Sequence, residues 1–178
     1  MVNSSLFCRI QLQLMMNLTA RAIGQPTKRL WTRSNAHALQ AYAEYTCSHL
    51  SSGVDEPLLQ RMNSEAYRMG RMLRRLFFIR NRAAAERLIV ALYRNIGISL
   101  SFSDRQQLCF HRCYFSRFYS PAVCLAASAL DDGIIRGLTG QSASRLSFTQ
   151  RITEGCNCCR ATFQPSNKKN EQESNRDR

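Results

Sequence analysis

Acidic residues are scarce in this sequence. Its 178 residues include 12 aspartates and glutamates against 25 lysines and arginines, so the formal net charge is +13 and the pI is near 10.0. Nearly all of the basic excess is arginine, whose planar guanidinium binds carboxylates and phosphates through paired hydrogen bonds. The composition favours an anionic partner, and charge alone does not separate nucleic acid, a membrane surface, an acidic protein and a small carboxylate.

Long apolar runs are missing as well. No stretch approaches the roughly 18–20 continuous apolar residues that cross a bilayer, so we predict no membrane span. The first residues lack the uninterrupted apolar segment of a secretion signal, because Arg9, Gln11, Gln13 and Asn17 divide it. We therefore expect a cytoplasmic protein, in which the eight cysteines remain thiols or bind metal rather than form structural disulfides.

The remaining composition, 44% hydrophobic and without a visible internal repeat, suits one compact domain with additions at both ends. Residues 1–34 hold five basic residues and no acid, and Pro26 interrupts them. We expect a basic arm there, either disordered or the product of a wrongly assigned start, with Met15 and Met16 as alternative starts. Residues 35–164 are predicted to form a single α+β domain, and residues 165–178 a disordered polar tail. No oligomeric state is predicted.

The spacing of apolar residues predicts helices in the first part of that domain. Helical periodicity runs from Asn35 to the Ser-Ser-Gly at 51–53, and a second helix begins at Asp55-Glu56-Pro57, where acids and proline suit a helix start. A third helix covers residues 81–95. After Pro121, an alanine-rich segment closed by glycines predicts a buried helix.

Strands are predicted where the apolar period shortens to two. Residues 96–102 alternate cleanly, and residues 105–113 do so less clearly. Residues 145–152 and 158–163 alternate on either side of a Thr-Glu-Gly-Cys-Asn turn, which predicts an antiparallel hairpin. The predicted fold is α+β, with the N-terminal helices on one face of a small antiparallel sheet and a C-terminal β-hairpin.

Six of the eight cysteines lie between Cys109 and Cys159, and three roles are open to them. Zinc or iron–sulfur binding is one, although two C-x-x-C knuckles are absent. The metal ligands would be Cys113, Cys124, Cys158 and Cys159, of which the last two point to opposite faces of a strand. A cysteine nucleophile is the second role, since His111 lies two residues from both Cys109 and Cys113. In the third, the cysteines are small buried apolar residues.

Residues 113–163 resemble a known family in the order of their motifs. A cysteine precedes a loop, and a second cysteine opens a helix that carries an aspartate one to two turns later. A Glu-Gly turn then leads to a strand with paired cysteines. This order resembles the C-terminal part of the L-2-amino-thiazoline-4-carboxylic acid hydrolases. The matching positions are Cys113, Cys124, Asp131, Glu154-Gly155 and Cys159. Asn157 and Arg160 stand where acidic residues are usual, which leaves the substrate open.

The resemblance implies a hydrolase that opens a C–N bond of a small cyclic amidine or thiazoline bearing a carboxylate. Either a thiolate or a water activated by a carboxylate would attack the amidine carbon. The resemblance makes Cys113, Cys124 and Cys159 nucleophile candidates and makes Asp131 and Glu154 acid–base candidates. Arg151 and His111 are candidates for substrate binding, Arg151 as a clamp for the carboxylate.

Two alternatives compete with this interpretation. A similar Gly-x-x-Cys-x-x-x-Phe ending occurs in 4-vinyl reductase-like domains, which favours a non-catalytic module that binds a small ligand or a metal. Asp131 is then a solvated helix acid, Glu154 a turn residue and Arg151 an exposed strand residue.

The other alternative is a nucleic-acid binder. The second predicted helix and the segment after it carry many arginines on one face, which would bind phosphates if it is not simply a solvated helix face. The arginines on the helix face are Arg61, Arg68, Arg71 and Arg75, and they are continued by Arg74, Arg80, Arg82 and Arg87. No zinc-finger histidine pair and no ribonucleoprotein signature accompanies them.

Overall fold

The structure, a computed structural model, describes residues 4–27, 29–30, 34–51, 54–103 and 107–165. Within these ranges the helices come first and the strands later, with one long helix between the two hairpins of the sheet. The elements are α1 (Ser4–Ile23), α2 (Asn35–Leu50), α3 (Glu56–Leu76), α4 (Arg82–Asn95), β1 (Ile98–Phe102), β2 (Gln107–Cys113), η1 (Tyr114–Arg117), α5 (Pro121–Thr139), β3 (Ser144–Gln150), η2 (Ile152–Glu154) and β4 (Cys159–Pro165).

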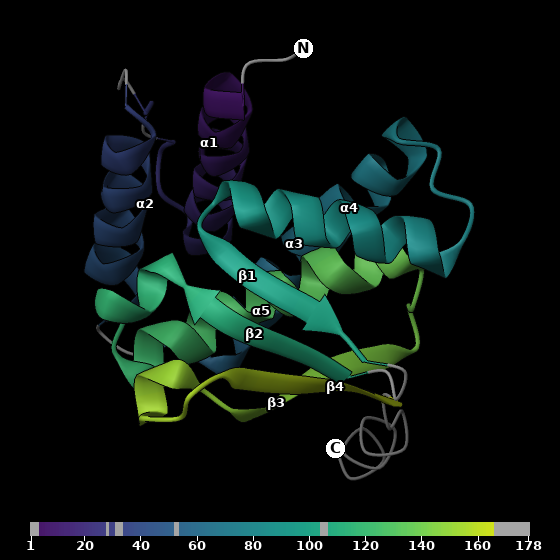
Figure 1. The fold of residues 1–178 in the computed structure, drawn as a ribbon. Helices are drawn as coiled ribbons and strands as arrows, with labels where there is room; N and C mark the ends of the chain where they lie inside the picture. The colour runs from purple at the N-terminus through teal and green to yellow at the C-terminus, as the bar shows by residue number, and fades with distance from the viewer. Residues whose placement is uncertain (1–3, 28, 31–33, 52–53, 104–106, 166–178) are drawn as a thin grey trace, which may run out of the picture.

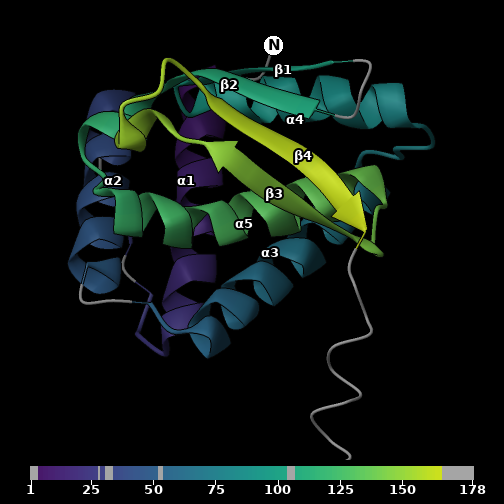
Figure 2. The same cartoon turned by 90° about the horizontal axis from the view of Figure 1, so that it is seen from below.

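The four described strands form one antiparallel sheet in the order β1-β2-β4-β3 (Figure 1). The helices lie on one face of this sheet, with α5 running beneath β3 and β4 and α3 beyond it (Figure 2). Inward-facing residues of β1, β2 and β4, among them Leu100, Leu108 and Ala161, join the helices in the core. The predicted α+β fold, its covered sheet face and its C-terminal β3–β4 hairpin are confirmed.

Helix starts follow the capping residues seen in the sequence. Asp55 accepts a hydrogen bond from the backbone N–H of Leu58 at 2.9 Å, with Pro57 in the first turn, as predicted. Ser120 accepts from Val123 N–H at 3.3 Å and caps α5. These caps satisfy N–H groups that the helix itself leaves without acceptors.

Glycines allow α3 and α5 to cross at close range. A Cβ on Gly137 would lie 2.6 Å from the carbonyl oxygen of Tyr67, and one on Gly70 would lie 2.5 Å from that of Ile134. The sequence predicted that glycines close this helix, and for Gly133 and Gly137 that prediction is wrong. Gly133 and Gly137 lie inside α5, which ends at Gly140 in the left-handed conformation.

The structure differs from the predicted arm at residues 1–34, because α1 is a 20-residue helix packed into the core. Pro26 lies after the end of α1 and so does not interrupt it. Leu12 and Met16 are fully buried, and Gln11 donates a hydrogen bond to the carbonyl of Leu92 at 2.9 Å. Apolar residues at three- and four-residue spacing are what bury this helix.

The predicted polar tail and the predicted lack of a membrane span can be compared with the described residues. Residues 166–178 of the predicted tail lie outside the described residues. None of the described helices has both the length and the apolar character that a bilayer-spanning segment needs.

Candidate active site

Two β-bulges determine which side chains reach the space between the sheet and α5. In the β1–β2 pair, Ser99 is opposite Arg112 and Leu100 is opposite Phe110, so His111 is an extra residue. In the β3–β4 pair, Thr149 is extra in the same way. An extra residue reverses the alternation of faces that follows it. Cys113 therefore faces inward although Cys109 and His111 face outward, and the second bulge turns Arg151 inward.

The inner face brings together residues that are far apart in the sequence. Cys124 and Asp131 lie two turns apart on α5, Cys113 ends β2, and Cys159 begins β4. The charge of Asp131 contributes to raising the pKa of each of the three thiols, and Cys124 does the same for Cys113 and Cys159. We call these four residues the inner cluster. They are four of the five residues to which the resemblance assigned catalysis.

Asp131 has the most perturbed acid–base behaviour of the inner cluster. Burial raises the pKa of its carboxyl from 3.8 to about 6, and nearby Asp132 adds to the increase. The hydroxyl of Tyr93 opposes this by donating a hydrogen bond to Oδ1 at 2.7 Å. The carboxyl is deeply enclosed, although the residue as a whole is only partly buried. A carboxyl with such a pKa can take and return a proton near neutral pH.

The inner thiols remain protonated in the empty site. Burial raises the pKa of Cys113 to about 12 and that of Cys159 to about 11, and it also raises the pKa of Cys124. At pH 7, a thiol with a pKa of about 12 is ionised in only about one molecule in 10⁵. The Cys159 sulfur instead accepts a hydrogen bond from the N–H of Ile152 at 3.2 Å. Of the two candidate attacking groups, the raised pKa values of the thiols favour a water activated by Asp131.

Polar groups of the β3–β4 connection border the inner cluster. The Arg151 side chain is 14% exposed, and its Nε is buried without a hydrogen-bond partner among the described residues. Its Nη1 is 3.4 Å from Oε1 of Glu154, and its guanidinium lies over the Phe148 ring. The Thr153 hydroxyl is also buried and faces the Cys124 thiol. Arg151 is thus not the exposed strand residue of the alternative, whereas Glu154 is exposed.

An open cavity of about 670 Å³ lies beside β2 and η1. Cys113 forms part of its wall, together with Ile152 from the β3–β4 connection. Three arginines, Arg94, Arg112 and Arg117, come from α4, β2 and η1, and no carboxylate is among the described residues that line the cavity. The remaining lining residues are Gly97, Ile98, Ser99, His111, Tyr114, Ser116 and Asn157. This combination suits a small anion.

The four candidate metal ligands are not brought together. Cys158 faces outward and interacts with Cys109, while the three inner thiols lie on the other side of the sheet. Within the part of the chain that the structure describes, no group of three or more His, Cys, Asp or Glu is placed to hold a metal ion. The proposed zinc or iron–sulfur ligand set is therefore not assembled.

The sequence analysis missed several residues of this site. Tyr93, which holds Asp131, falls among ordinary apolar positions of α4, and its spacing carries no sign of a hydrogen bond to α5. Arg94, Arg112 and Arg117 stand singly, each on a different element. The general excess of arginine in the composition was the one sequence feature that pointed to these three residues. His111 does line the cavity, as expected of a substrate-binding residue, but its ring also contacts outward-facing residues.

The chain has a distant structural likeness to an H-NOX protein. No protein-family model matches it, and no curated protein matches it. A crystal structure of an H-NOX protein from S. oneidensis in the Fe(II)NO ligation state matches with a TM-score of 0.36 and 11% identity. The match covers 85% of this chain and 90% of that chain.

Proposed function

We propose that this protein is a small-molecule hydrolase that opens a C–N bond in a cyclic amidine or thiazoline bearing a carboxylate. The observation that carries the proposal is the position of Cys113. Its thiol interacts electrostatically with Asp131 in the inner cluster, and Cys113 is also one of the residues that line the arginine-lined cavity. A ligand held in the cavity by its carboxylate would need to extend past Cys113 to bring its reacting end to Asp131, which lies behind the cavity lining.

Binding follows from charge. Arg94, Arg112 and Arg117 offer several guanidinium groups to a carboxylate, and the bidentate geometry of one such pair sets the orientation of the ring. A cyclic amidine carries positive charge when protonated, and that end is attracted to the carboxylate of Asp131. The two ends of the substrate thus match the two ends of the site.

The reaction needs one proton acceptor that later becomes a donor. Asp131 accepts a proton from water while the water oxygen bonds to the amidine carbon. The ring C–N bond then breaks as the ring nitrogen takes this proton back from Asp131. The carbon-bound hydroxyl passes its remaining proton through Asp131 to the released amine, and the carbon becomes a carbonyl. The net change is the addition of one water molecule. The neutral thiols of Cys113 and Cys124 line the path and contribute weak S–H donors.

The test is turnover of a panel of cyclic amidines and thiazolines, each with and without a carboxylate, followed by chromatography of the ring-opened product. We expect activity on the carboxylates, a loss of at least about 100-fold in Asp131→Asn, and a higher KM in Arg112→Gln. Arg145→Gln is the matched control, since Arg145 is an exposed arginine on β3 outside the cavity. Binding of the carboxylates without turnover would replace the hydrolase by a ligand-binding module.

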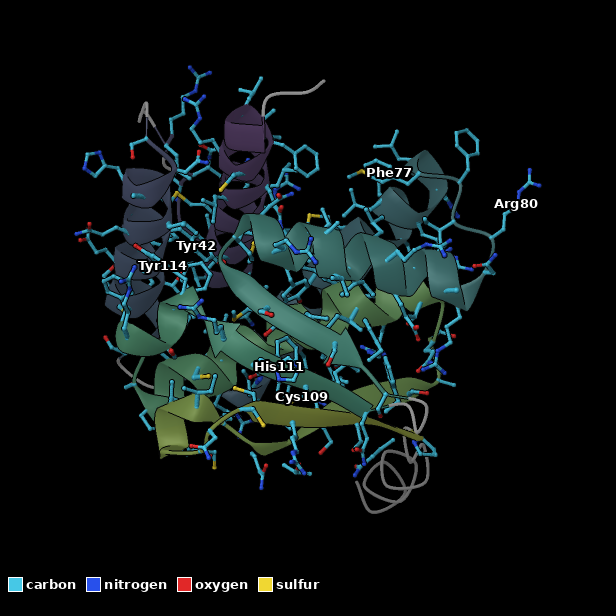
Figure 3. All side chains as sticks on the ribbon, in the orientation of Figure 1. Tyr42, Phe77, Arg80, Cys109, His111 and Tyr114 are labelled. Carbon is cyan, nitrogen blue, oxygen red and sulfur yellow. The ribbon has the colours of Figure 1, made fainter. Side chains whose placement is uncertain are left out.

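A second candidate function has its own supporting observation, a hollow of about 650 Å³ at the end of α3. Arg71, Arg74, Arg75 and Arg80 line it, and no acid is among its described lining residues. Phe78, also in the lining, is 81% exposed and has a φ of 50°, the left-handed region that non-glycine residues rarely occupy. Arginines beside an exposed aromatic ring suit the phosphates and bases of single-stranded nucleic acid. Arg80 extends away from the body of the molecule (Figure 3).

Binding of a fluorescent single-stranded RNA at several salt concentrations tests this candidate. The double variant Arg71→Gln, Arg75→Gln should bind more weakly and lower the slope of log K against log salt by about 1 to 1.5. Arg112→Gln, which alters the other cavity, should bind the RNA like the unchanged protein. Equal binding by all three proteins would exclude this hollow as an RNA site.

A further inference from the structure

A second pair of cysteines lies on the opposite, uncovered face of the sheet. Cys109 in β2 lies opposite Arg160 of β4, two residues after Cys158, and each of the two thiols shifts the pKa of the other. Both are partly exposed free thiols. Figure 3 shows Cys109 and His111 on the face of β2 that is turned away from the helices. Neither thiol belongs to the inner cluster, although their neighbour His111 also lines the arginine-lined cavity.

The two thiols belong to a continuous row of polar contacts. Ser101 Oγ lies 2.8 Å from Nε2 of His111, and Nδ1 of His111 lies 3.6 Å from the Cys109 sulfur. At the far end of the row, Arg160, directly opposite Cys109 in the strand register, interacts with Cys158. The row is Ser101, His111, Cys109, Cys158, Arg160. It joins a base, two sulfurs and a fixed positive charge.

The pKa values of the two thiols are shifted in opposite directions. The Cys109 thiol and the guanidinium of Arg160 lower the pKa of Cys158, whereas burial and the neighbouring Cys158 raise the pKa of Cys109. Cys158 is thus the better thiolate of the two. Cys109 keeps its proton and has His111 next to it as an acceptor. This division matches the attacking and resolving cysteines of a dithiol exchange site.

We propose that Cys158 and Cys109 form a thiol–disulfide exchange site for small disulfides, with His111 as the base for the second step. In the first step, the Cys158 sulfur bonds to one sulfur of the small disulfide, whose S–S bond breaks and releases one thiolate. In the second step, Cys109 gives its proton to His111 and its sulfur bonds to that of Cys158. The mixed disulfide breaks and releases the second thiolate. The protein dithiol is oxidised by two electrons, and the small disulfide is reduced to two thiols.

Glutathione disulfide is the probe for this proposal. The folded protein is incubated with it, quenched with an alkylating reagent and mapped by mass spectrometry of its peptides. We expect a Cys109–Cys158 disulfide as the first stable product, with the inner thiols of Cys113, Cys124 and Cys159 still free. A different first pair, or glutathione retained on Cys156 while Cys158 stays free, would overturn the proposal.

Variants separate the two steps. Cys109→Ser should stop at a mixed disulfide on Cys158, and Cys158→Ser should leave Cys109 unreacted over the same time. His111→Gln should accumulate the mixed disulfide because the second step slows by about tenfold or more. Cys156→Ser, which removes another partly exposed thiol from the same connection, is the matched control and should react like the unchanged protein. Oxidation of Cys158→Ser at the unchanged rate would refute the assigned roles.

A denatured sample supplies a control that does not depend on any variant folding. In the unfolded chain, the row of contacts is absent, so glutathione disulfide should no longer select Cys158. The same preference for Cys158 in folded and denatured protein would show that local sequence, and not the arrangement on the sheet, causes it.

Discussion

Asp131→Asn removes a titrating carboxyl from the interior while keeping the size of the side chain. The asparagine oxygen can still accept the hydrogen bond that Tyr93 donates to Asp131. In the unchanged protein, burial holds the pKa of Asp131 at about 6, above its ordinary value of 3.8. The folded state therefore binds this proton more tightly than the unfolded state does.

The sign and size of the effect follow from that difference. Because the folded state holds the proton more tightly, the free energy of unfolding falls as pH rises from 3.8 to about 6 and changes little above it. At about 1.4 kcal/mol per pH unit, the full fall is about 3 kcal/mol. Roughly 2 kcal/mol of it lies between about pH 4.5 and pH 7. Asparagine does not titrate, so the variant lacks this fall and should be the more stable protein at neutral pH.

Urea unfolding of both proteins at several pH values measures the effect. The difference between the unchanged protein and Asp131→Asn isolates this one carboxyl, because the other titrating groups are common to both. Tyr93→Phe gives an independent check, since loss of the donated hydrogen bond raises the pKa of Asp131 further and extends the fall to higher pH. A difference that is flat with pH, or that favours the unchanged protein increasingly as pH rises, would refute the interior placement of a titrating Asp131.

Three further changes test the packing and the helix ends. Gly137→Ala should lower the free energy of unfolding by about 3 kcal/mol or more, because the new Cβ would lie 2.6 Å from the Tyr67 carbonyl oxygen; urea unfolding measures it. Ser120→Ala should cost about 1 kcal/mol in the same assay, since it removes the cap of α5. Phe78→Gly should instead stabilise the protein by about 1 kcal/mol, because it relieves a positive φ, and thermal unfolding measures this effect. The same variant should bind RNA more weakly if the arginine hollow holds bases, and fluorescence anisotropy measures that binding.

Much of the fold could be predicted because its signals are local. The helical period from Asn35 and the acids at Asp55 and Glu56 correctly predicted α2 and α3, and two-residue alternation correctly predicted the β3–β4 hairpin. The opposite directions of Cys158 and Cys159 also follow from the period of a strand. Residues 1–34 were the exception, because α1 has a modest apolar stripe whose burial depends on partners elsewhere in the chain.

The candidate site depended more on position in space than on spacing in the sequence. The sequence named Cys113, Cys124, Asp131 and Cys159 as one set through resemblance alone, and gave no measure of their separation. Their meeting on the inner face depends on a bulge at His111, a feature of register between two strands. Alternation assigned His111 and Cys113 to one face, and the extra residue separated them.

Local periodicity by itself determined that α2, α3 and the β3–β4 hairpin form, since each of these needs only residues nearby in the chain. The tertiary structure alone decided that Gly133 and Gly137 lie at a helix crossing, that Tyr93 holds Asp131, and that Cys109 meets Cys158. It also decided the protonation of Asp131 and the inner thiols, because burial is produced by elements that are distant in sequence.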